Sequence, residues 1–308
     1  MSDANDSLIV NQWEAGERLD KILATRFKEH YSRTYFQYLI ENGLVFLNEI
    51  PQKKRIKVKE GDEIEIRFAS LPEISISPEN IPLTILYEDD HLLAINKPAG
   101  MVIHPAPGNW SGTFVNALLF HCSTLNVSDN LRPGIVHRLD KETSGILLAA
   151  KSLEMQQKLI ELFASRKIYK EYMAISIGNP QEGMISEPIG RHPVNRKQMA
   201  VIPNGKPAIT HVHLIEKKGP LNLLKIVIAT GRTHQIRVHL KFKGAPVLGD
   251  CTYGNPADNQ KFGAKRQMLH AALLKFQHPI TGQNLELKAP FPEDFLFFVE
   301  KLSKKIFF

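Results

Sequence analysis

Cysteine is scarce in this chain of 308 residues, which holds only Cys122 and Cys251. Two cysteines so far apart in sequence build neither a disulfide framework nor the ligand spacing of a zinc finger. The class of small, disulfide-stapled secreted domains is therefore excluded. A reduced protein of the cytoplasm is the expectation.

Long apolar runs and nucleotide-binding motifs are also lacking. No apolar run is long enough to cross a bilayer, and the start MSDANDSLIV has neither the basic residues nor the apolar core of a signal peptide. No G-x-G-x-x-G or P-loop motif follows a strand-like segment. We therefore expect no membrane insertion, no secretion and no nucleotide cofactor.

The overall composition is that of a folded protein, with 43% hydrophobic and 23% charged residues. The length favours two domains. Lys and Arg number 39 against 32 for Asp and Glu, which leaves a net charge of +7. This excess favours a polyanionic partner.

Residues 15–70 have the pattern of a small domain with two helices followed by short strands. Apolar residues recur at helical spacing over 17–28, and Ser32 can cap a second helix. The segment 71–83 is rich in Pro and Ser, so we expect it to link this domain to a second one over 84–308.

The first domain carries a run of basic residues that has two interpretations. By itself such a run is most often a solvated face. However, the segments ERLDKILA, SRTYFQYLIENGLVFLNE and KVKEGDEIEI together resemble an S4 RNA-binding domain. The resemblance implies that basic side chains of the second helix and the following loop contact RNA phosphates, here Arg33, Lys53, Lys54 and Arg55. Such contacts position a protein on RNA without reading bases.

The second domain alternates hairpin-spaced strands with a few helices. This pattern predicts an α+β fold, with helices packed on a mixed, largely antiparallel sheet. The clearest helix is 152–167, which Ser152 can cap. Further helices are expected over 113–121 and 292–302, and strands over 85–97 (two), 134–138, 145–150, 170–178, 221–229, 269–277 and 284–289.

The stretch GIVHRLDKETSG, residues 134–145, places a cluster of charges between two apolar segments. Asp140 is either an ordinary exposed turn residue or part of a site. The neighbouring Arg138 and Lys141 would keep its carboxylate ionised, and flanking strands would fix its position.

A second polar cluster is ATGRTHQIRVHL, residues 229–240. Thr233 can cap a helix opening at His234, with Arg237 on its face, although the alternating apolar residues also permit a strand. A partly buried Arg237 needs a carboxylate partner, whether its role is structural or functional.

Five segments together resemble the RluA-type RNA pseudouridine synthases. They are NKPAGMVIHP (96–105), GIVHRLDKETSGILLAAKS (134–152), KEYMA (170–174), GRTHQIRVHL (231–240) and LHA (269–271). With an S4 domain in front, the chain resembles the branch that modifies bacterial large-subunit ribosomal RNA. The resemblance implies that specific uridines of RNA are isomerised to pseudouridine, with base flipping and without a cofactor.

The resemblance also assigns roles in the second domain. Asp140 matches the catalytic aspartate, and Arg237 would keep it ionised. Attack at C6 of the base, attack at C1′ of the sugar, and proton abstraction to a glycal all stay open. Tyr172 would stack on the uracil and help remove the C5 proton, Arg138 would fill the gap left by the flipped uridine, and Leu269 would pack near the base. Without the resemblance, Tyr172 and Leu269 are ordinary core residues.

Two other functions compete with this interpretation. A zinc hydrolase acting on RNA is suggested by the histidines His211, His213, His234, His239 and His270, yet H-E-x-x-H and the deaminase zinc pattern are lacking. A non-catalytic ribosomal RNA-binding factor is the second alternative. Transfer RNA stays open as a substrate, a monomer is expected, and Asn96, Lys97 and His104 are expected to be structural.

Overall fold

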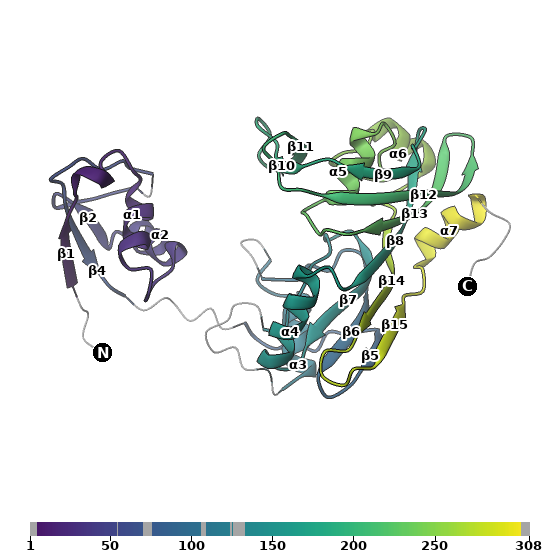
Figure 1. Ribbon diagram of the computed structural model, residues 1–308, viewed down its shortest axis with the longest axis horizontal. Coiled ribbons are helices and arrows are strands. Elements are labelled where there is room, and N and C mark those ends of the chain that lie inside the picture. The colour runs from purple at the N-terminus through teal and green to yellow at the C-terminus, as the bar shows by residue number, and fades with distance from the viewer. Residues whose placement is uncertain are drawn as a thin grey trace. The chain divides into compact units, whose positions relative to one another are not determined.

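The computed structural model describes residues 5–53, 55–69, 76–105, 109–123, 125 and 133–302, and the chain divides into two compact units, Met1–Ser75 and Ile76–Phe308 (Figure 1). Lys54 lies outside the described residues. Within the described part, no helix has the length and apolar character needed to cross a membrane.

The first unit packs two helices on a four-stranded sheet. The helices are α1 (Leu19–Arg26) and α2 (Arg33–Glu41), and the strand order is β1 (Asn5–Ile9), β4 (Glu63–Arg67), β2 (Val45–Leu47), β3 (Ile50–Pro51). Ser32 caps α2 as predicted, because its side chain accepts a hydrogen bond from the Tyr35 N–H. Strand β1 was not predicted and pairs antiparallel with β4. The arrangement of helices and short strands is consistent with an S4-like domain.

The second unit is built on a nine-stranded sheet with the order β5-β6-β7-β14-β8-β13-β12-β9, with β15 paired to β14. The pair β7–β14 is parallel and the other pairs are antiparallel, which confirms the mixed, largely antiparallel sheet. The strands are β5 (Ile85–Glu88), β6 (Leu92–Lys97), β7 (Ser144–Ala150), β8 (Tyr169–Ile177), β9 (Gly183–Ser186), β12 (Ile209–Lys218), β13 (Leu221–Ile228), β14 (Leu269–Gln277) and β15 (Asn284–Lys288).

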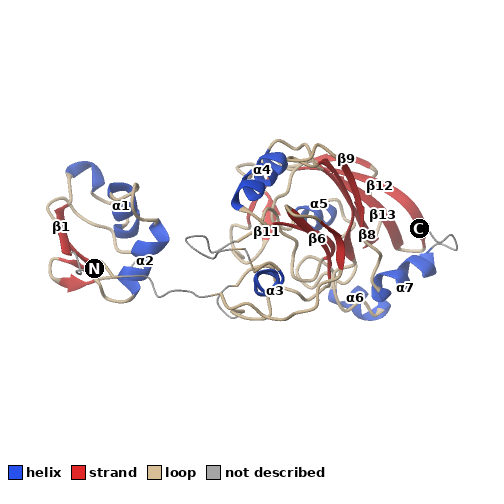
Figure 2. Cartoon of the chain, turned by 90° about the horizontal axis from the view of Figure 1, so that it is seen from below, coloured by secondary structure: helices blue, strands red, loops and turns tan. Residues whose placement is uncertain are grey.

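Helices cover both faces of this curved sheet (Figure 2). Side chains that alternate along β7 and β8 pack against α3 (Phe114–His121) and α5 (Gln235–Phe242) on one face, and against α4 (Leu153–Ala164) and α7 (Glu293–Leu302) on the other. The hairpin of β10 (Ile189–Arg191) and β11 (Met199–Val201) and the helix α6 (Pro256–Phe262) complete the unit.

The structure contradicts one predicted strand. Residues 134–138 form no strand, and only Ile135 makes a bridge, to Ala149 of β7. The reason is local, since the Leu148 N–H of β7 donates to the His137 ring nitrogen Nε2 at 2.8 Å. A side chain therefore takes the place of the backbone carbonyl that a paired strand would offer, and the segment becomes a loop leading to Asp140.

The segment 71–83, predicted as a linker, is described by the structure only in its second part. Residues 71–75 lie outside the described residues. Beyond them, Ile76 is buried beside α3, and Asn116 of α3 donates to the Ser77 carbonyl at 2.9 Å and accepts from the Glu79 N–H at 3.0 Å through its own carbonyl. These contacts hold the start of the second unit on its core.

Candidate active site

Asp140 stands at the first position of a turn that remote segments hold in place. The Thr143 N–H donates to the Asp140 carbonyl at 3.0 Å and closes the turn. Four further bonds reach it: Lys97 Nζ to the Lys141 carbonyl (3.0 Å), the Gly100 N–H to the same carbonyl (2.9 Å), Arg266 to the Glu142 carbonyl (3.0 Å) and Gln267 to the Thr143 hydroxyl (2.6 Å). The backbone beside Asp140 is thus anchored from two sides, which fixes where the carboxylate points.

Lys97 is the least exposed of these anchors. Its side chain is fully buried, and its Nζ donates to the carbonyls of Pro98, Met101 and Lys141 at 2.7, 3.1 and 3.0 Å. Burial lowers the pKa of Lys97 to about 7, whereas three carbonyl acceptors match the three N–H bonds of an ammonium and favour the charged form. These three hydrogen bonds of its Nζ all go to backbone carbonyls, which fits the structural role expected for it.

Gly145 explains why a glycine follows the turn. Its φ is +108°, and a Cβ there would lie 2.2 Å from the Ala271 carbonyl oxygen of β14. Only glycine permits this close approach of β7 and β14. The approach carries Leu269 of β14, and Tyr172 of the adjacent β8, to the region of Asp140.

Arg237 lies on a helix, as the first of the two alternatives predicted. Helix α5 begins after His234, which has the left-handed φ of 56°, so the predicted cap at Thr233 is wrong. The side-chain oxygen of Gln235 instead accepts from the Arg232 N–H (3.0 Å) and the Thr230 hydroxyl (2.8 Å). These bonds shape the turn that leads into α5 and places Arg237 in the first turn of that helix.

The guanidinium of Arg237 is shared by two carboxylates. Nη1 donates to Asp140 at 2.8 Å, while Nε and Nη2 donate to the two oxygens of Asp250 at 2.7 and 2.9 Å. Burial disfavours the charge of Arg237, but the bonded Asp250 and then Asp140 outweigh it and raise its pKa. The forked pair with Asp250 fixes the plane of the guanidinium and leaves Nη1 aimed at Asp140.

Asp250 is a site residue that the sequence analysis missed. Its side chain is fully buried and also accepts from the N–H groups of Thr252 and Tyr253 at 2.8 and 3.0 Å. The sequence held two signals for it: Arg237 needs a carboxylate partner, and a glycine, Gly249, precedes Asp250. The structure explains that glycine, because its φ is +78° and a Cβ there would lie 1.8 Å from the Arg266 carbonyl oxygen.

His234 approaches Asp140 from the other side. Its Nε2 lies 3.8 Å from Asp140 Oδ1, and its Nδ1 lies 2.8 Å from the Tyr253 hydroxyl, which accepts from the Met199 N–H. Burial is the largest influence on His234 and lowers its pKa, so the ring is neutral near pH 7. Arg237 is therefore the positive charge bonded to Asp140.

One pocket brings together the five site residues predicted in the second unit: Arg138, Asp140, Tyr172, Arg237 and Leu269 all line it. Burial, and then the charge of Asp140, raises the pKa of the Tyr172 phenol. The phenol therefore stays protonated near neutral pH, which favours a stacking or hydrogen-bonding role over that of a ready proton acceptor.

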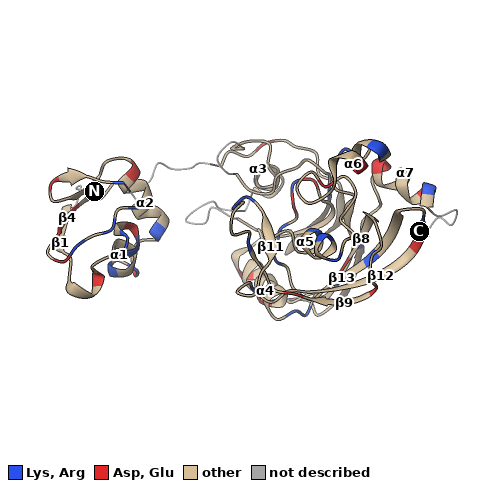
Figure 3. Ribbon diagram, turned by 90° about the horizontal axis from the view of Figure 1, so that it is seen from above, with Lys and Arg blue, Asp and Glu red and all other residues tan. Residues whose placement is uncertain are grey.

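The residues predicted to contact RNA from the first unit are exposed where described. Lys53 and Arg55 are exposed, and Arg33 is exposed but donates to the buried Asp20 at 3.1 and 3.2 Å. Lys54 lies outside the described residues. Lys and Arg occur in both units and are interspersed with Asp and Glu (Figure 3).

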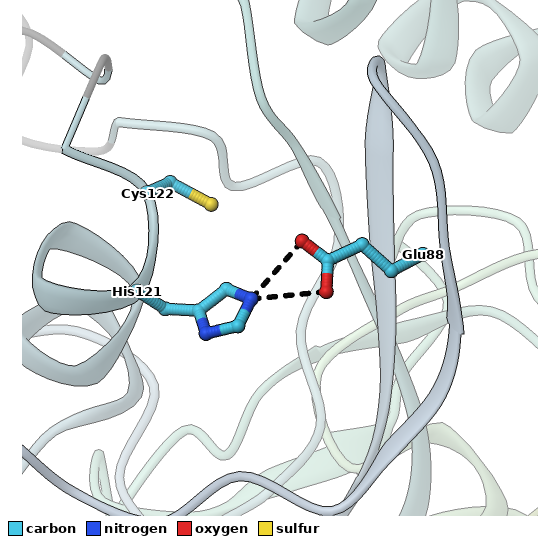
Figure 4. A group of neighbouring side chains, drawn as sticks. All are labelled: Glu88, His121 and Cys122. Atoms are coloured by element: carbon cyan, nitrogen blue, oxygen red, sulfur yellow. Dashed lines mark hydrogen bonds and ion pairs between the residues drawn. The ribbon is translucent and has the colours of Figure 1, made fainter.

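The histidines behind the zinc alternative do not meet as a ligand set. Among the described residues, the one group of three side chains close enough to share a metal ion is Glu88, His121 and Cys122 (Figure 4). The His121 ring lies 3.0 Å from both Glu88 oxygens, and the Lys151 ammonium lies 2.9 Å from one of them. The Glu88 carboxylate is thus already paired with the Lys151 ammonium, which makes it a less suitable metal ligand.

Comparison with known proteins decides the family. A sequence profile described as RNA pseudouridylate synthase matches residues 91–242. The "Ribosomal large subunit pseudouridine synthase D" of Pasteurella multocida is 44% identical over 302 residues, which cover 94% of this chain and 92% of that protein. This chain belongs to the RNA pseudouridylate synthase family.

Other members extend the similarity. The "Uncharacterized RNA pseudouridine synthase YlyB" of Bacillus subtilis is 39% identical over 300 residues, covering 96% of this chain and 98% of that protein. The solved structure of "Human RNA Pseudouridylate Synthase Domain Containing 1" aligns with a TM-score of 0.56 and 26% identity, over 73% of this chain and 87% of that one. The chain is an RNA pseudouridine synthase, as the resemblance implied, and neither rival function gains support from these relatives.

Proposed function

We propose that this enzyme isomerises specific uridines of bacterial large-subunit ribosomal RNA, with Asp140 as its catalytic carboxylate. The contact between Arg237 and Asp140 carries the proposal, because it joins two segments 97 residues apart in the lining of one pocket. The substrate follows the printed name of the relatives at 39–44% identity. We further propose that the enzyme acts as a monomer in the cytoplasm.

The reaction needs a carboxylate but no redox agent. The bond between C1′ and N1 of the uridine breaks, the uracil rotates, C1′ joins C5, C5 loses its proton, and N1 gains one. Asp140 can attack C6, attack C1′ or take a ribose proton, and each route needs it ionised. Arg237, itself held by Asp250, supports that state.

The other pocket residues have defined places in this scheme. Tyr172 and Leu269 offer an aromatic face and an aliphatic side chain to the base. Arg138 lies exposed at the pocket and can occupy the space that a flipped uridine leaves in the RNA, a step that costs a few kcal/mol. In the first unit, Arg33, Lys53, Lys54 and Arg55 would hold the RNA by its phosphates.

The substitution Asp140→Asn tests the catalytic assignment. It removes the charge with little change in shape, so we expect product formation to fall on the order of 10³-fold or more while RNA binding persists. Pseudouridine is to be mapped in transcribed large-subunit ribosomal RNA and in cellular RNA with and without the protein. Asp90→Asn, at an exposed turn, is the matched control.

Two outcomes would contradict the proposal. Full product formation by Asp140→Asn would remove Asp140 from the chemistry and would revive the non-catalytic alternative. Product in transfer RNA but not in large-subunit ribosomal RNA would keep the enzyme class and replace the substrate.

A further inference from the structure

A second pocket adjoins the one that holds Asp140 and is lined by four cationic side chains. They are Arg138, Arg166, Lys170 and Arg232, and no Asp or Glu lies among the residues that line it. The two pockets share Arg138, Tyr172 and Arg232 as part of their walls. A cavity whose charged lining residues are all cationic, beside the proposed catalytic carboxylate, is suited to an anionic part of the substrate.

Lys170 is the unusual member of this set. Only 7% of the residue is exposed, and its side-chain ammonium forms no hydrogen bond or ion pair with any residue that the structure describes. Its Nζ lies 5.7 Å from the centre of the Phe163 ring, which also lines the pocket. A buried ammonium without a carboxylate destabilises the fold. Burial, and then the charge of Arg166, lowers the pKa of Lys170 accordingly.

Arg166 and Arg232 add donors that are suited to phosphate, while Arg138 is the residue proposed above to fill the gap that the flipped uridine leaves. Arg138 and Arg166 are exposed and have no carboxylate within ion-pair distance in the described part of the chain. Arg232 donates from its Nε to the Pro207 carbonyl at 3.1 Å, and this bond does not use the terminal nitrogens Nη1 and Nη2. Guanidinium groups match the geometry of phosphate oxygens, and a buried ammonium adds a point charge.

We propose that this second pocket binds a backbone phosphate of the RNA next to the target uridine. The inference rests on the proposed function. The shared wall would let one nucleotide place its base against Tyr172 and an adjacent phosphate against Lys170. A stacked base is the less suitable occupant, because the His137 ring already stacks on Phe163 at 4.6 Å and 22°.

The substitution Lys170→Met tests the pocket, because it keeps the apolar stem and removes the charge. We expect KM for large-subunit ribosomal RNA to rise about tenfold with little change in kcat, the size of one charged hydrogen bond. The slope of log affinity against log salt should fall by about 0.7 to 0.9. Lys275→Met, at an exposed lysine paired with Glu286, is the control and should change neither quantity.

A modified RNA identifies the ligand as phosphate. A neutral methylphosphonate is placed at each phosphate flanking a uridine that the wild type converts. At one of these positions the KM of the wild type should rise about tenfold, whereas the KM of Lys170→Met should stay at the value that this variant has for unmodified RNA. Equal further losses in both proteins at every position would overturn the phosphate assignment.

Thermal unfolding separates binding from a structural role. Lys170→Met removes an unpaired buried charge, so its Tm should be equal to or above that of the wild type, and Lys170→Arg should keep KM near the wild-type value. A lowered Tm for Lys170→Met, or an unchanged KM and salt slope, would overturn the inference. A wild type without activity on ribosomal RNA would instead overturn the proposed function.

Discussion

At the scale of single residues, the site depends on how charges are shared. Arg237 is bonded to Asp140 through one nitrogen and to Asp250 through two, so the buried carboxylate of Asp250 orients the guanidinium that bonds Asp140. The cluster carries one positive and two negative charges. Asp140 is the accessible carboxylate of the two, because its side chain is 18% exposed whereas that of Asp250 is fully buried.

His270 gives a prediction about acid stability. Its Nδ1 lies 2.9 Å from the Ser144 hydroxyl and its Nε2 lies 3.2 Å from the Ala289 carbonyl, an arrangement that suits the neutral ring. Burial lowers its pKa from 6.5 to about 4. Between pH 6.5 and about pH 4, this histidine is protonated in the unfolded chain but neutral in the folded one. The free energy of unfolding therefore falls as the pH falls through this range.

The measurement compares the wild type with His270→Gln in urea at pH 7.5 and at about pH 5. The wild type should lose roughly 2 kcal/mol more of its unfolding free energy than the variant between these conditions. His213→Gln, at an exposed position on β12, is the matched control. An identical pH dependence in wild type and His270→Gln would contradict the prediction.

At the scale of elements, the site is a loop held between strands. The turn that begins at Asp140 is bonded to Lys97 at the end of β6 and to Gln267 just before β14, and α5 supplies Arg237. Loops commonly carry functional groups on a rigid scaffold. Here the scaffold is the junction of β7, β14 and β8.

The loop after β3 in the first unit gives a prediction about RNA binding. Replacing Lys53, Lys54 and Arg55 by Ala should weaken binding of large-subunit ribosomal RNA. Each lost phosphate contact should reduce the salt slope by about 0.7 to 0.9. Filter binding across a salt series measures both quantities. Lys21→Ala, in the same unit but paired with Glu17 at 2.8 Å, is the control. Unchanged affinity and slope would leave this loop without a role in binding.

At the scale of the whole molecule, the two units have separate cores. The buried cluster of the first unit draws only on residues before 70, and the clusters of the second unit draw only on residues from 76 onward. A unit with its own core can in principle fold alone. The described residues that line the pocket around Asp140 all belong to the second unit.

These separate cores predict that residues 76–308 fold and react without the first unit. The shortened chain should unfold in one cooperative transition and keep kcat within about twofold of the full chain, with a higher KM because phosphate contacts are lost. Calorimetry and pseudouridine assays measure both properties. Loss of cooperative unfolding, or an unchanged KM, would contradict this division of roles.

Much of the fold could be predicted from the sequence because the patterns that indicate helices, caps and strands are local. The caps at Ser32 and Ser152, the amphipathic helices and the alternating strands depend on neighbours in sequence, so periodicity predicts them. The strand predicted over 134–138 failed because the His137 side chain, and not the backbone, meets Leu148. Strand β1 was missed, and its pairing with the distant β4 is what defines it.

The sequence by itself determined most of the elements and the family resemblance, and through that resemblance it pointed to five residues that meet in one pocket. Tertiary structure alone decided that Asp250 holds Arg237, that Lys97 anchors the turn at Asp140 and that Lys170 is buried without a partner. The reason is physical. Periodicity reports which side of an element faces the core, whereas ion pairing and desolvation depend on which remote segments the sheet topology brings together.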